Sequence, residues 1–247
     1  MKYFEKNKMR SSRPMHHAHR RLNSIQTQLF YTKISNLDNS VEIVHEYDPK
    51  RDLPNVLLVH DFINEHDYEE IVAFINTHRN AWSQSCYDGC SIDHTQRYSY
   101  DMMWPNFCKH KSLKKLCDLL HINTTNIEHP QLICYTKGGH FCLHHDTAHI
   151  IDVDGNAQEC SPYSTDYIDM VHDISTYRTV SGLLYLNTLD DGHTYFPKLN
   201  FKQKPIKSAL LLWPNVKPDG SIEQSTVHTG CSVGTLKQIM NIWINTC

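Results

Sequence analysis

This sequence lacks long apolar segments and has little net charge. Its 247 residues contain no apolar run near the roughly eighteen residues that a membrane-spanning helix needs. The first residues lack the apolar stretch of a secretory signal. The net charge of −3 gives no overall case for binding to nucleic acid or to a membrane surface. These absences predict a cytoplasmic protein whose partner is neither a membrane nor a nucleic acid.

Enough apolar sequence is present for a folded domain. Hydrophobic residues make up 40% of the chain and charged residues 21%, which excludes a disordered or low-complexity protein. A chain of this length can bury a sizeable core without disulfides or a structural metal.

Positive charge is concentrated at the N-terminus. Residues 1–33 carry eight Lys or Arg and one acid, Glu5, whereas the rest of the chain has a net charge of −10. This arm could act as an electrostatic tether or as an organelle-targeting peptide. A solvated and poorly ordered terminus is the simpler interpretation. We therefore predict a basic, flexible arm at residues 1–40 and one functional domain at residues 41–247.

The cysteines and most of the histidines give weak signals. The nine cysteines occur without a secretory signal, so we interpret them as reduced thiols. Cys86 and Cys90 form a C-x3-C pair with no second pair, which is weak evidence for zinc. Among the eighteen histidines, His16, His17 and His19 lie in the arm, where a tail fixes no ligand geometry.

Helical patterns occur in the first half of the chain. Asn64 is suited to cap a helix whose apolar face runs through residues 68–75. Residues 111–121 predict a second amphipathic helix. Residues 83–100 are polar and contain Gly89, so we expect a long loop there, either a lid over a substrate or a passive surface loop.

Short β segments dominate the remainder. Strands are predicted at residues 41–45, 55–60, 131–136, 141–150, 179–186, 208–213, 225–228 and 236–244. Turn sequences such as Lys137-Gly-Gly and Pro218-Asp-Gly separate them, and residues 151–176 are predicted to be a loop insertion. Helices followed by many short strands favour a β-sandwich or open barrel backed by helices.

One histidine and one aspartate stand out within these strands. His144 and Asp146 are two residues apart, so a regular strand projects both from one face. They would supply two ligands of a 2-His-1-carboxylate triad, which binds Fe(II) and leaves positions open. His228, in a distant strand, is the candidate third ligand. A closed structural zinc site is the alternative, but it normally needs four ligands.

An H-x-D pattern alone is weak evidence, but the surrounding residues strengthen it. The relevant positions are Tyr135, Gly138, Phe141, His144, Asp146, Arg178, Ser181, Leu183, Tyr185, Leu186, Gly192, Thr194, Phe196, Pro197, Pro205, Lys207, His228, Gly230, Cys231, Val233, Lys237 and Trp243. In this order and spacing they resemble the prolyl 4-hydroxylase branch of the 2-oxoglutarate/Fe(II) dioxygenases. The resemblance extends from about residue 55 to the C-terminus.

The sequence also departs from that branch. Ser232 replaces its usual Pro, Gln238 replaces the Trp that follows its Lys, and Phe141 stands where many members have Tyr. Lys237 follows His228 by nine residues, where the branch usually has ten. The insertion at residues 151–176 lengthens the interval between Asp146 and His228.

The resemblance implies a fold and a reaction. The fold would be mainly β with flanking helices (α+β): a double-stranded β-helix, or jelly-roll, at residues 130–247, packed against N-terminal helices. The reaction would hydroxylate a prolyl residue in a peptide or protein and convert 2-oxoglutarate to succinate and CO2. Fe(II), 2-oxoglutarate and O2 would be required, with ascorbate as reductant.

The resemblance and the ligand chemistry together assign roles to seven residues. His144, Asp146 and His228 would be the catalytic Fe(II) ligands. Lys237 would anchor the far carboxylate of 2-oxoglutarate, and Tyr135 would donate a hydrogen bond to it. The resemblance places Arg178 and Trp243 on the substrate side.

Other interpretations stay open at this point. The same chemistry could act on a lysyl side chain or a small molecule, because a fold does not determine a substrate. A non-catalytic jelly-roll binding module is a further alternative, although the complete ligand set and Lys237 argue against it. Tyr135 and Trp243 could be core aromatics, and Arg178 could form a structural ion pair. Nothing in the sequence indicates an oligomeric state.

Overall fold

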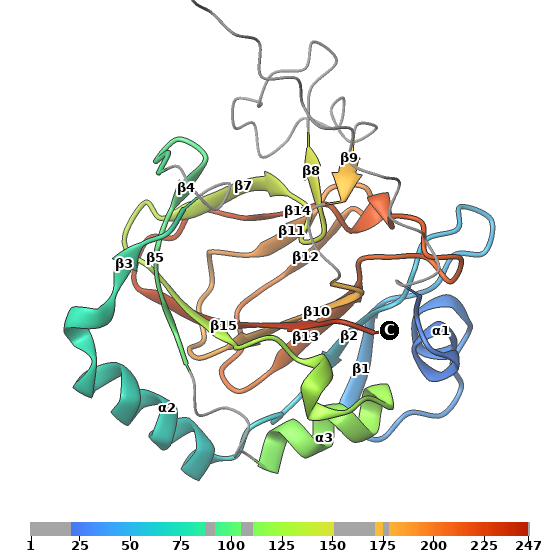
Figure 1. Ribbon diagram of the computed structural model, residues 1–247, viewed down its shortest axis with the longest axis horizontal. Coiled ribbons are helices and arrows are strands. Elements are labelled where there is room, and N and C mark those ends of the chain that lie inside the picture. The colour runs from blue at the N-terminus through green and yellow to red at the C-terminus, as the bar shows by residue number, and fades with distance from the viewer. Residues whose placement is uncertain (1–20, 87–91, 105–110, 151–170, 175–177, 247) are drawn as a thin grey trace, which may run out of the picture.

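Two antiparallel sheets face each other in the computed structural model, which describes residues 21–86, 92–104, 111–150, 171–174 and 178–246 (Figure 1). The large sheet has the order β1 (Val41–His45), β2 (Val56–Val59), β13 (Leu210–Pro214), β10 (Val180–Tyr185), β15 (Lys237–Ile244), β6 (Gln131–Tyr135), β5 (Tyr100–Met103) and β3 (Ser83–Gln84). The small sheet has the order β12 (Phe201–Gln203), β11 (Thr194–Phe196), β14 (His228–Gly230), β7 (His140–His144) and β4 (Arg97–Tyr98). The predicted mainly-β class with flanking helices is confirmed.

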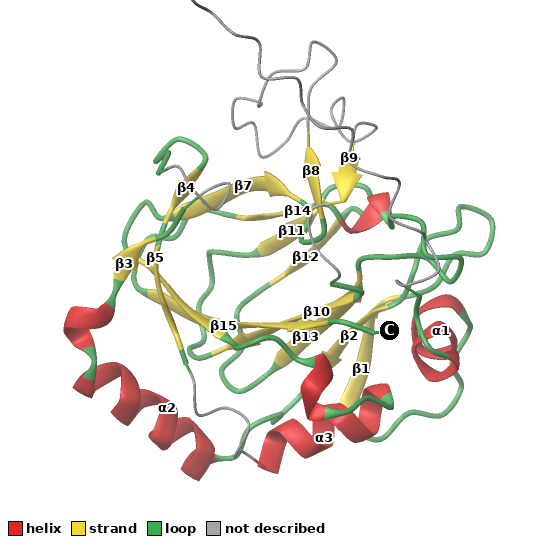
Figure 2. Ribbon diagram, in the orientation of Figure 1, coloured by secondary structure: helices red, strands yellow, loops and turns green. Residues whose placement is uncertain are grey.

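Helices cover the large sheet on the side away from the small one (Figure 2). Helix α2 (Glu65–Thr77) begins at Asn64, whose side chain accepts a hydrogen bond from the backbone N–H of Asp67, as predicted. Helix α3 (Lys111–Leu120) also forms where expected. Short 3-10 helices occur at Arg79–Ala81 and Thr124–Asn126. No helix in the described residues combines the length and apolarity needed to cross a membrane.

The period-two alternation of the central strands divides the core into two layers. On β15, Met240 and Ile242 pack with the helices, together with Leu132 of β6 and Leu184 of β10. The alternate residues face the small sheet, where Ile239 packs with other inward side chains. The inward cluster includes Ile133, Tyr135, Leu183, Tyr185, Phe196 and Trp213. The second layer carries the site described below.

The predicted flexible arm is wrong for part of its length. Helix α1 (Ser24–Tyr31) lies within it, with Asn23 and Gln26 capping its first turn reciprocally. Phe30 is completely buried in the helix-side core. The Tyr31 hydroxyl donates a 2.7 Å hydrogen bond to the buried Glu223. The apolar residues of such a short helix do not show a clear helical period within a basic segment. Burial against the core stabilises the helix. Residues 1–20 lie outside the described residues.

Three predicted local structures differ from those observed. The predicted loop at residues 83–100 contains β3, β4 and the start of β5, which extend the edges of both sheets. Part of the predicted insertion, Val171–Ile174, forms β9 and pairs with β8 (Ala148–Ile150). The predicted strand at 225–228 is instead a 3-10 turn, Gln224–Thr226, before β14 begins. Edge pairing depends on a partner strand, so local alternation predicts it poorly.

One cysteine departs from the predicted reduced state. Cys142 is disulfide-bonded, whereas Cys86, Cys117, Cys134 and Cys231 are free. A disulfide is more typical of an oxidising compartment than of the cytoplasm.

Candidate metal centre

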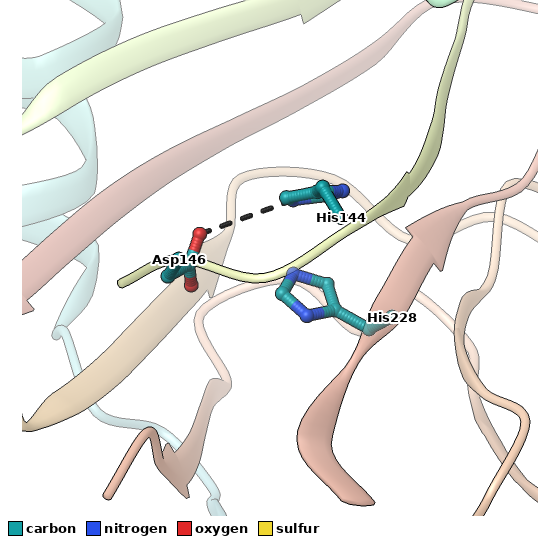
Figure 3. A group of neighbouring side chains, drawn as sticks. All are labelled: His144, Asp146 and His228. Carbon is teal, nitrogen blue, oxygen red and sulfur yellow. Dashed lines mark ion pairs between the residues drawn. The ribbon is translucent and has the colours of Figure 1, made fainter. Parts of the chain in front are cut away.

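The structure brings together the three predicted ligands from two neighbouring strands. His144 ends β7, Asp146 follows two residues later, and His228 begins β14 directly opposite His144. One potential ligand atom from each residue lies within 4.8 Å of the others. The His144 Nε2 and Asp146 Oδ1 atoms are 3.9 Å apart (Figure 3). Two imidazoles and one carboxylate in this arrangement form a donor set suited to Fe(II).

A β-bulge on β7 shapes the wall beside these ligands. His144 pairs with His228 and Phe141 pairs with Gly230, so β7 has one residue more than β14 between the two pairs. A regular strand would place Phe141 and His144 on opposite faces. The bulge turns both inward, and their rings stack with centroids 3.6 Å apart.

Backbone carbonyls orient both imidazoles. The Nδ1 atom of His144 lies 2.8 Å from the carbonyl oxygen of Cys142, and Nδ1 of His228 lies 3.0 Å from that of Thr226. Because a carbonyl can only accept, each Nδ1 carries the hydrogen and each Nε2 is left as the metal donor. Burial lowers the pKa of both rings, to well below the usual value for His144. The neutral, ligating form is therefore favoured.

A chain of two hydrogen bonds supports the carboxylate of Asp146. Ser181 Oγ donates a 2.5 Å hydrogen bond to Asp146 Oδ2, and Asn215 Nδ2 donates a 2.8 Å bond to Ser181 Oγ. Both residues are almost completely buried. Burial raises the pKa of Asp146, but His228, His144, Ser181 and Arg178 outweigh that effect and lower it to about 2. The carboxylate therefore stays ionised, with Oδ1 toward His144.

Asn215 was not found by sequence reasoning. It follows strand β13 and reaches Ser181 because β13 pairs with β10. No local pattern marks it as a site residue, since its role depends on the register of two strands that are distant in sequence.

Lys237 is a buried cation next to this centre. It is 2% exposed, and its Nζ donates a 2.7 Å hydrogen bond to the carbonyl of Gly192. Within the described part of the chain it forms no ion pair with an acid. Burial lowers the pKa of Lys237 to about 8. A buried ammonium group without a counter-ion is unfavourable, so this position is suited to an anionic ligand.

Two tyrosines flank that cation. Its Nζ lies 5.3 Å from the ring centroid of Tyr135, which is opposite Lys237 in the strand register, and 5.9 Å from that of Tyr185. Burial raises the pKa of Tyr135, so its hydroxyl remains a donor. No described residue hydrogen-bonds to that hydroxyl. The Tyr185 hydroxyl is instead hydrogen-bonded to the Thr194 hydroxyl, at 2.9 Å.

Arg178 and Trp243 contact each other at the edge of the centre. The guanidinium carbon of Arg178 lies 3.5 Å above the Trp243 ring. Arg178 also forms a 2.8 Å ion pair with Glu128 and approaches the carbonyl oxygen of Asp146 at 3.5 Å. Glu128, which sequence reasoning missed, thus restrains Arg178 over the indole.

The chain is similar in sequence to curated proteins. No family model matches the chain. It is 29% identical over 133 residues to a protein of Acanthamoeba polyphaga mimivirus named "Putative prolyl 4-hydroxylase", across 53% of this chain and 50% of that protein. It is 31% identical over 129 residues to prolyl 4-hydroxylase subunit alpha-3 of Rattus norvegicus, across 51% and 21% respectively. The chain thus spans half the length, or less, of these curated relatives.

Solved structures share the fold. The viral collagen prolyl hydroxylase of Paramecium bursaria Chlorella virus-1, in its 2OG complex, has a TM-score of 0.53 at 19% identity, across 78% of this chain and 96% of that one. A prolyl hydroxylase of Trichoplax adhaerens, bound to a hypoxia inducible factor peptide fragment, has a TM-score of 0.53 at 15% identity, across 77% and 83%. The predicted jelly-roll is therefore confirmed. Over about half its length the chain is thus similar in sequence to proteins named prolyl 4-hydroxylase, and its fold is similar to that of solved prolyl hydroxylases.

Proposed function

We propose that this protein is an Fe(II)- and 2-oxoglutarate-dependent dioxygenase that hydroxylates a prolyl residue in a peptide or protein. His144, Asp146 and His228 would hold the metal. Their two nitrogens and one oxygen suit Fe(II) and leave coordination positions for other ligands. The names of the curated relatives support this reaction.

The observation that carries the proposal is the buried Lys237. Its ammonium group has no acidic partner among the described residues and lies in the same inter-sheet layer as the three ligands. A dicarboxylate that binds the metal at one end would bring its second carboxylate to this cation. The structural neighbour with 2OG bound supports 2-oxoglutarate as that ligand.

The protein's own groups would bind and orient the reactants. Lys237 would neutralise the far carboxylate of the cosubstrate, and the free Tyr135 hydroxyl would donate a hydrogen bond to it. Ser181 and Asn215 would keep Asp146 in one orientation toward the metal. When bound, Fe(II) with 2-oxoglutarate and O2 would supply the oxidising power for C–H hydroxylation, with succinate and CO2 as co-products. Ascorbate would serve as the reductant.

The substrate side would be formed by Trp243 and Arg178. The indole offers an apolar face to a pyrrolidine ring, and Glu128 limits the movement of Arg178 beside it. The neighbour that binds a peptide fragment supports a peptide as substrate.

Succinate formation tests the proposal. The purified protein would be incubated with Fe(II), 2-oxoglutarate and ascorbate in air, with and without proline-containing peptides. We expect succinate that increases with peptide, and a peptide product heavier by one oxygen atom. Absence of succinate with every peptide, in protein shown to contain iron, would contradict the proposed function. Failure to bind iron would contradict the metal centre itself.

A further inference from the structure

Glu223 is a buried acid that the proposed reaction does not use. It is 2% exposed and lies at the start of the 3-10 turn that leads into β14. Its side chain accepts hydrogen bonds from the backbone N–H and the hydroxyl of Ser225, at 3.0 and 2.6 Å, and from the hydroxyl of Tyr31, at 2.7 Å. All of these partners are donors, which suits a carboxylate because it can only accept. Glu223 is therefore held between helix α1 and this turn.

The backbone of Glu223 is joined to the segment that carries two of the candidate ligands. His145 lies between His144 and Asp146 and is 6% exposed. The backbone N–H of Thr147 donates a 3.2 Å hydrogen bond to His145 Nδ1, so the hydrogen of this ring is on Nε2. His145 Nε2 donates a 3.1 Å hydrogen bond to the carbonyl oxygen of Glu223. A movement of Glu223 would therefore disturb the chain between both ligands.

The same residue contacts a support of the third ligand. The hydroxyl of Thr226 lies 2.9 Å from the carbonyl oxygen of Glu223. The carbonyl oxygen of Thr226 accepts the hydrogen bond that orients His228. In addition, the backbone N–H of Glu223 donates a 2.9 Å hydrogen bond to the carbonyl of Asn215, which supports Asp146 through a serine hydroxyl. Glu223 thus connects the ligand on β14 with the two ligands at the end of β7.

Helix α1 supplies the hydroxyl that holds this acid. Tyr31 ends α1, is 7% exposed and lies 192 residues before Glu223 in the sequence. Burial and the neighbouring carboxylate raise the pKa of Tyr31 far above its ordinary value, so its hydroxyl remains a donor. Among the described residues, Tyr31 provides the hydrogen bond to Glu223 Oε2. Loss of this donor would leave a buried carboxylate oxygen without that partner, which is unfavourable.

We propose that Glu223, held by Tyr31 of helix α1, is a positioning residue that fixes the two ligand-bearing strands relative to each other. It is not a metal ligand and acts through His145 and Thr226. Because these hydrogen bonds connect α1 to the ligands, binding of a divalent ion and docking of α1 strengthen each other reciprocally. The inference rests on the metal centre of the proposed function.

The affinity for Mn(II) tests this role. Mn(II) would be titrated into the full chain under nitrogen, and the free ion would be followed by electron paramagnetic resonance. Tyr31→Phe removes only a hydroxyl, and we expect the Kd to rise about threefold, which is part of the free energy of one ordinary hydrogen bond. Glu223→Met removes both acceptor oxygens. We expect its Kd to rise about tenfold or more, as for the loss of other groups that support metal ligands.

Two further variants serve as controls. Glu223→Gln keeps an acceptor for Ser225 and an amide group that can bond to the Tyr31 hydroxyl, so it should restore most of the affinity that Glu223→Met loses. Tyr47→Phe removes the hydroxyl of a ring whose centroid lies 6.2 Å from that of Tyr31. Within the described residues that hydroxyl forms no hydrogen bond. The Kd of Tyr47→Phe should therefore equal that of the wild type.

The absorption spectrum of bound Co(II) separates positioning from stability. Its d–d bands report coordination geometry, and thermal unfolding would show at which temperatures each variant is folded. We expect the bands of folded Tyr31→Phe and Glu223→Met to differ from those of the wild type and the bands of Tyr47→Phe to match them. If Glu223→Met does not fold, Tyr31→Phe decides. A wild-type Kd and a wild-type spectrum in Tyr31→Phe would overturn the inference, even with a lower melting temperature.

The two proposals fail in different ways. If Mn(II) affinity depends on Tyr31 and Glu223 but no succinate forms, the positioning role stands and the proposed function is wrong. If a peptide is hydroxylated and Tyr31→Phe binds Mn(II) as the wild type does, the positioning role is wrong and the proposed function stands. A wild type that binds no Mn(II) would overturn both.

Discussion

His228 lies directly opposite His144 in the pairing of β14 with β7, and their ring centroids are 4.2 Å apart. Residues 84 positions apart in sequence are thereby presented as one pair of nitrogen donors. Backbone carbonyls fix the orientation of both rings, so the two donors do not depend on a bound metal for their placement. The centre is preorganised by the sheet.

Removing either imidazole should abolish metal binding at this centre. His144→Ala or His228→Ala leaves one nitrogen and one carboxylate, which hold a divalent ion weakly. Titration with Fe(II) under nitrogen would measure the loss, and succinate formation should cease with it. His140→Ala, on the same strand, is the matched control and should bind iron normally. Full turnover by either ligand variant would disprove the triad.

The hydroxyl of Ser181 should tune metal affinity. Ser181→Ala removes the 2.5 Å hydrogen bond to Asp146, and loss of such a supporting bond typically lowers metal affinity roughly 10- to 100-fold. Isothermal titration with Mn(II) would measure this effect. Ser181→Thr keeps the hydroxyl and serves as the control. Equal affinity in the Ala variant would show that Asp146 does not need this support.

Replacing Lys237 should chiefly affect the cosubstrate. Lys237→Met removes the buried charge while keeping the length of the side chain. We expect the Kd for 2-oxoglutarate to rise roughly thirtyfold or more, as for truncation of one partner of a buried charge pair. Binding would be followed with Mn(II)-loaded protein by calorimetry. An unchanged Kd would mean that the anchoring cation lies elsewhere.

The same lysine should make cosubstrate binding depend on pH. Because burial lowers the pKa of Lys237 to about 8, the free protein loses this charge above that pH. Binding of a carboxylate then requires proton uptake, so the Kd for 2-oxoglutarate should rise by up to about tenfold per pH unit above pH 8. Lys237→Arg, whose charge persists, should remove this dependence. An identical profile in both proteins would exclude Lys237 as its source.

Stability should show the opposite trend. The pKa of Lys237 is about 8 in the folded protein, against an ordinary value of 10.5 for a lysine side chain. Between these values the unfolded chain holds a proton that the folded chain has lost, so the contribution of this group to stability rises with pH. Urea unfolding of wild type and Lys237→Met between pH 7 and about 10 would isolate it. The two curves should converge as pH increases.

Helix α1 should contribute to the stability of the domain. Phe30 is completely buried against the core, and Phe→Ala changes at such sites cost about 3–5 kcal/mol of unfolding free energy. Urea denaturation would measure the change in Phe30→Ala. Gln28→Ala, at an exposed position of the same helix, should have little effect. A small loss of unfolding free energy in Phe30→Ala would mean that this segment belongs to a flexible arm, as the sequence predicted.

Much of this molecule could be predicted from local sequence patterns. Alternation of apolar residues marked the central strands, Asn64 marked the start of α2, and the spacing of His144 and Asp146 placed both at one site. These features depend on the periods of strands and helices and on capping, which act over a few residues. The ordered motifs around them indicated the family.

The tertiary structure alone decided the remaining features. The bulge that turns Phe141 beside His144 and the support of Ser181 by Asn215 both depend on strand register. Burial of α1 and pairing of the edge strands β3 and β4 depend on surfaces supplied by distant parts of the chain. Such contacts join residues far apart in sequence, so no local pattern contains them. Likewise, Lys237 is recognisable as a cation in the sequence, but only the folded chain shows that it is buried without an acidic partner among the described residues.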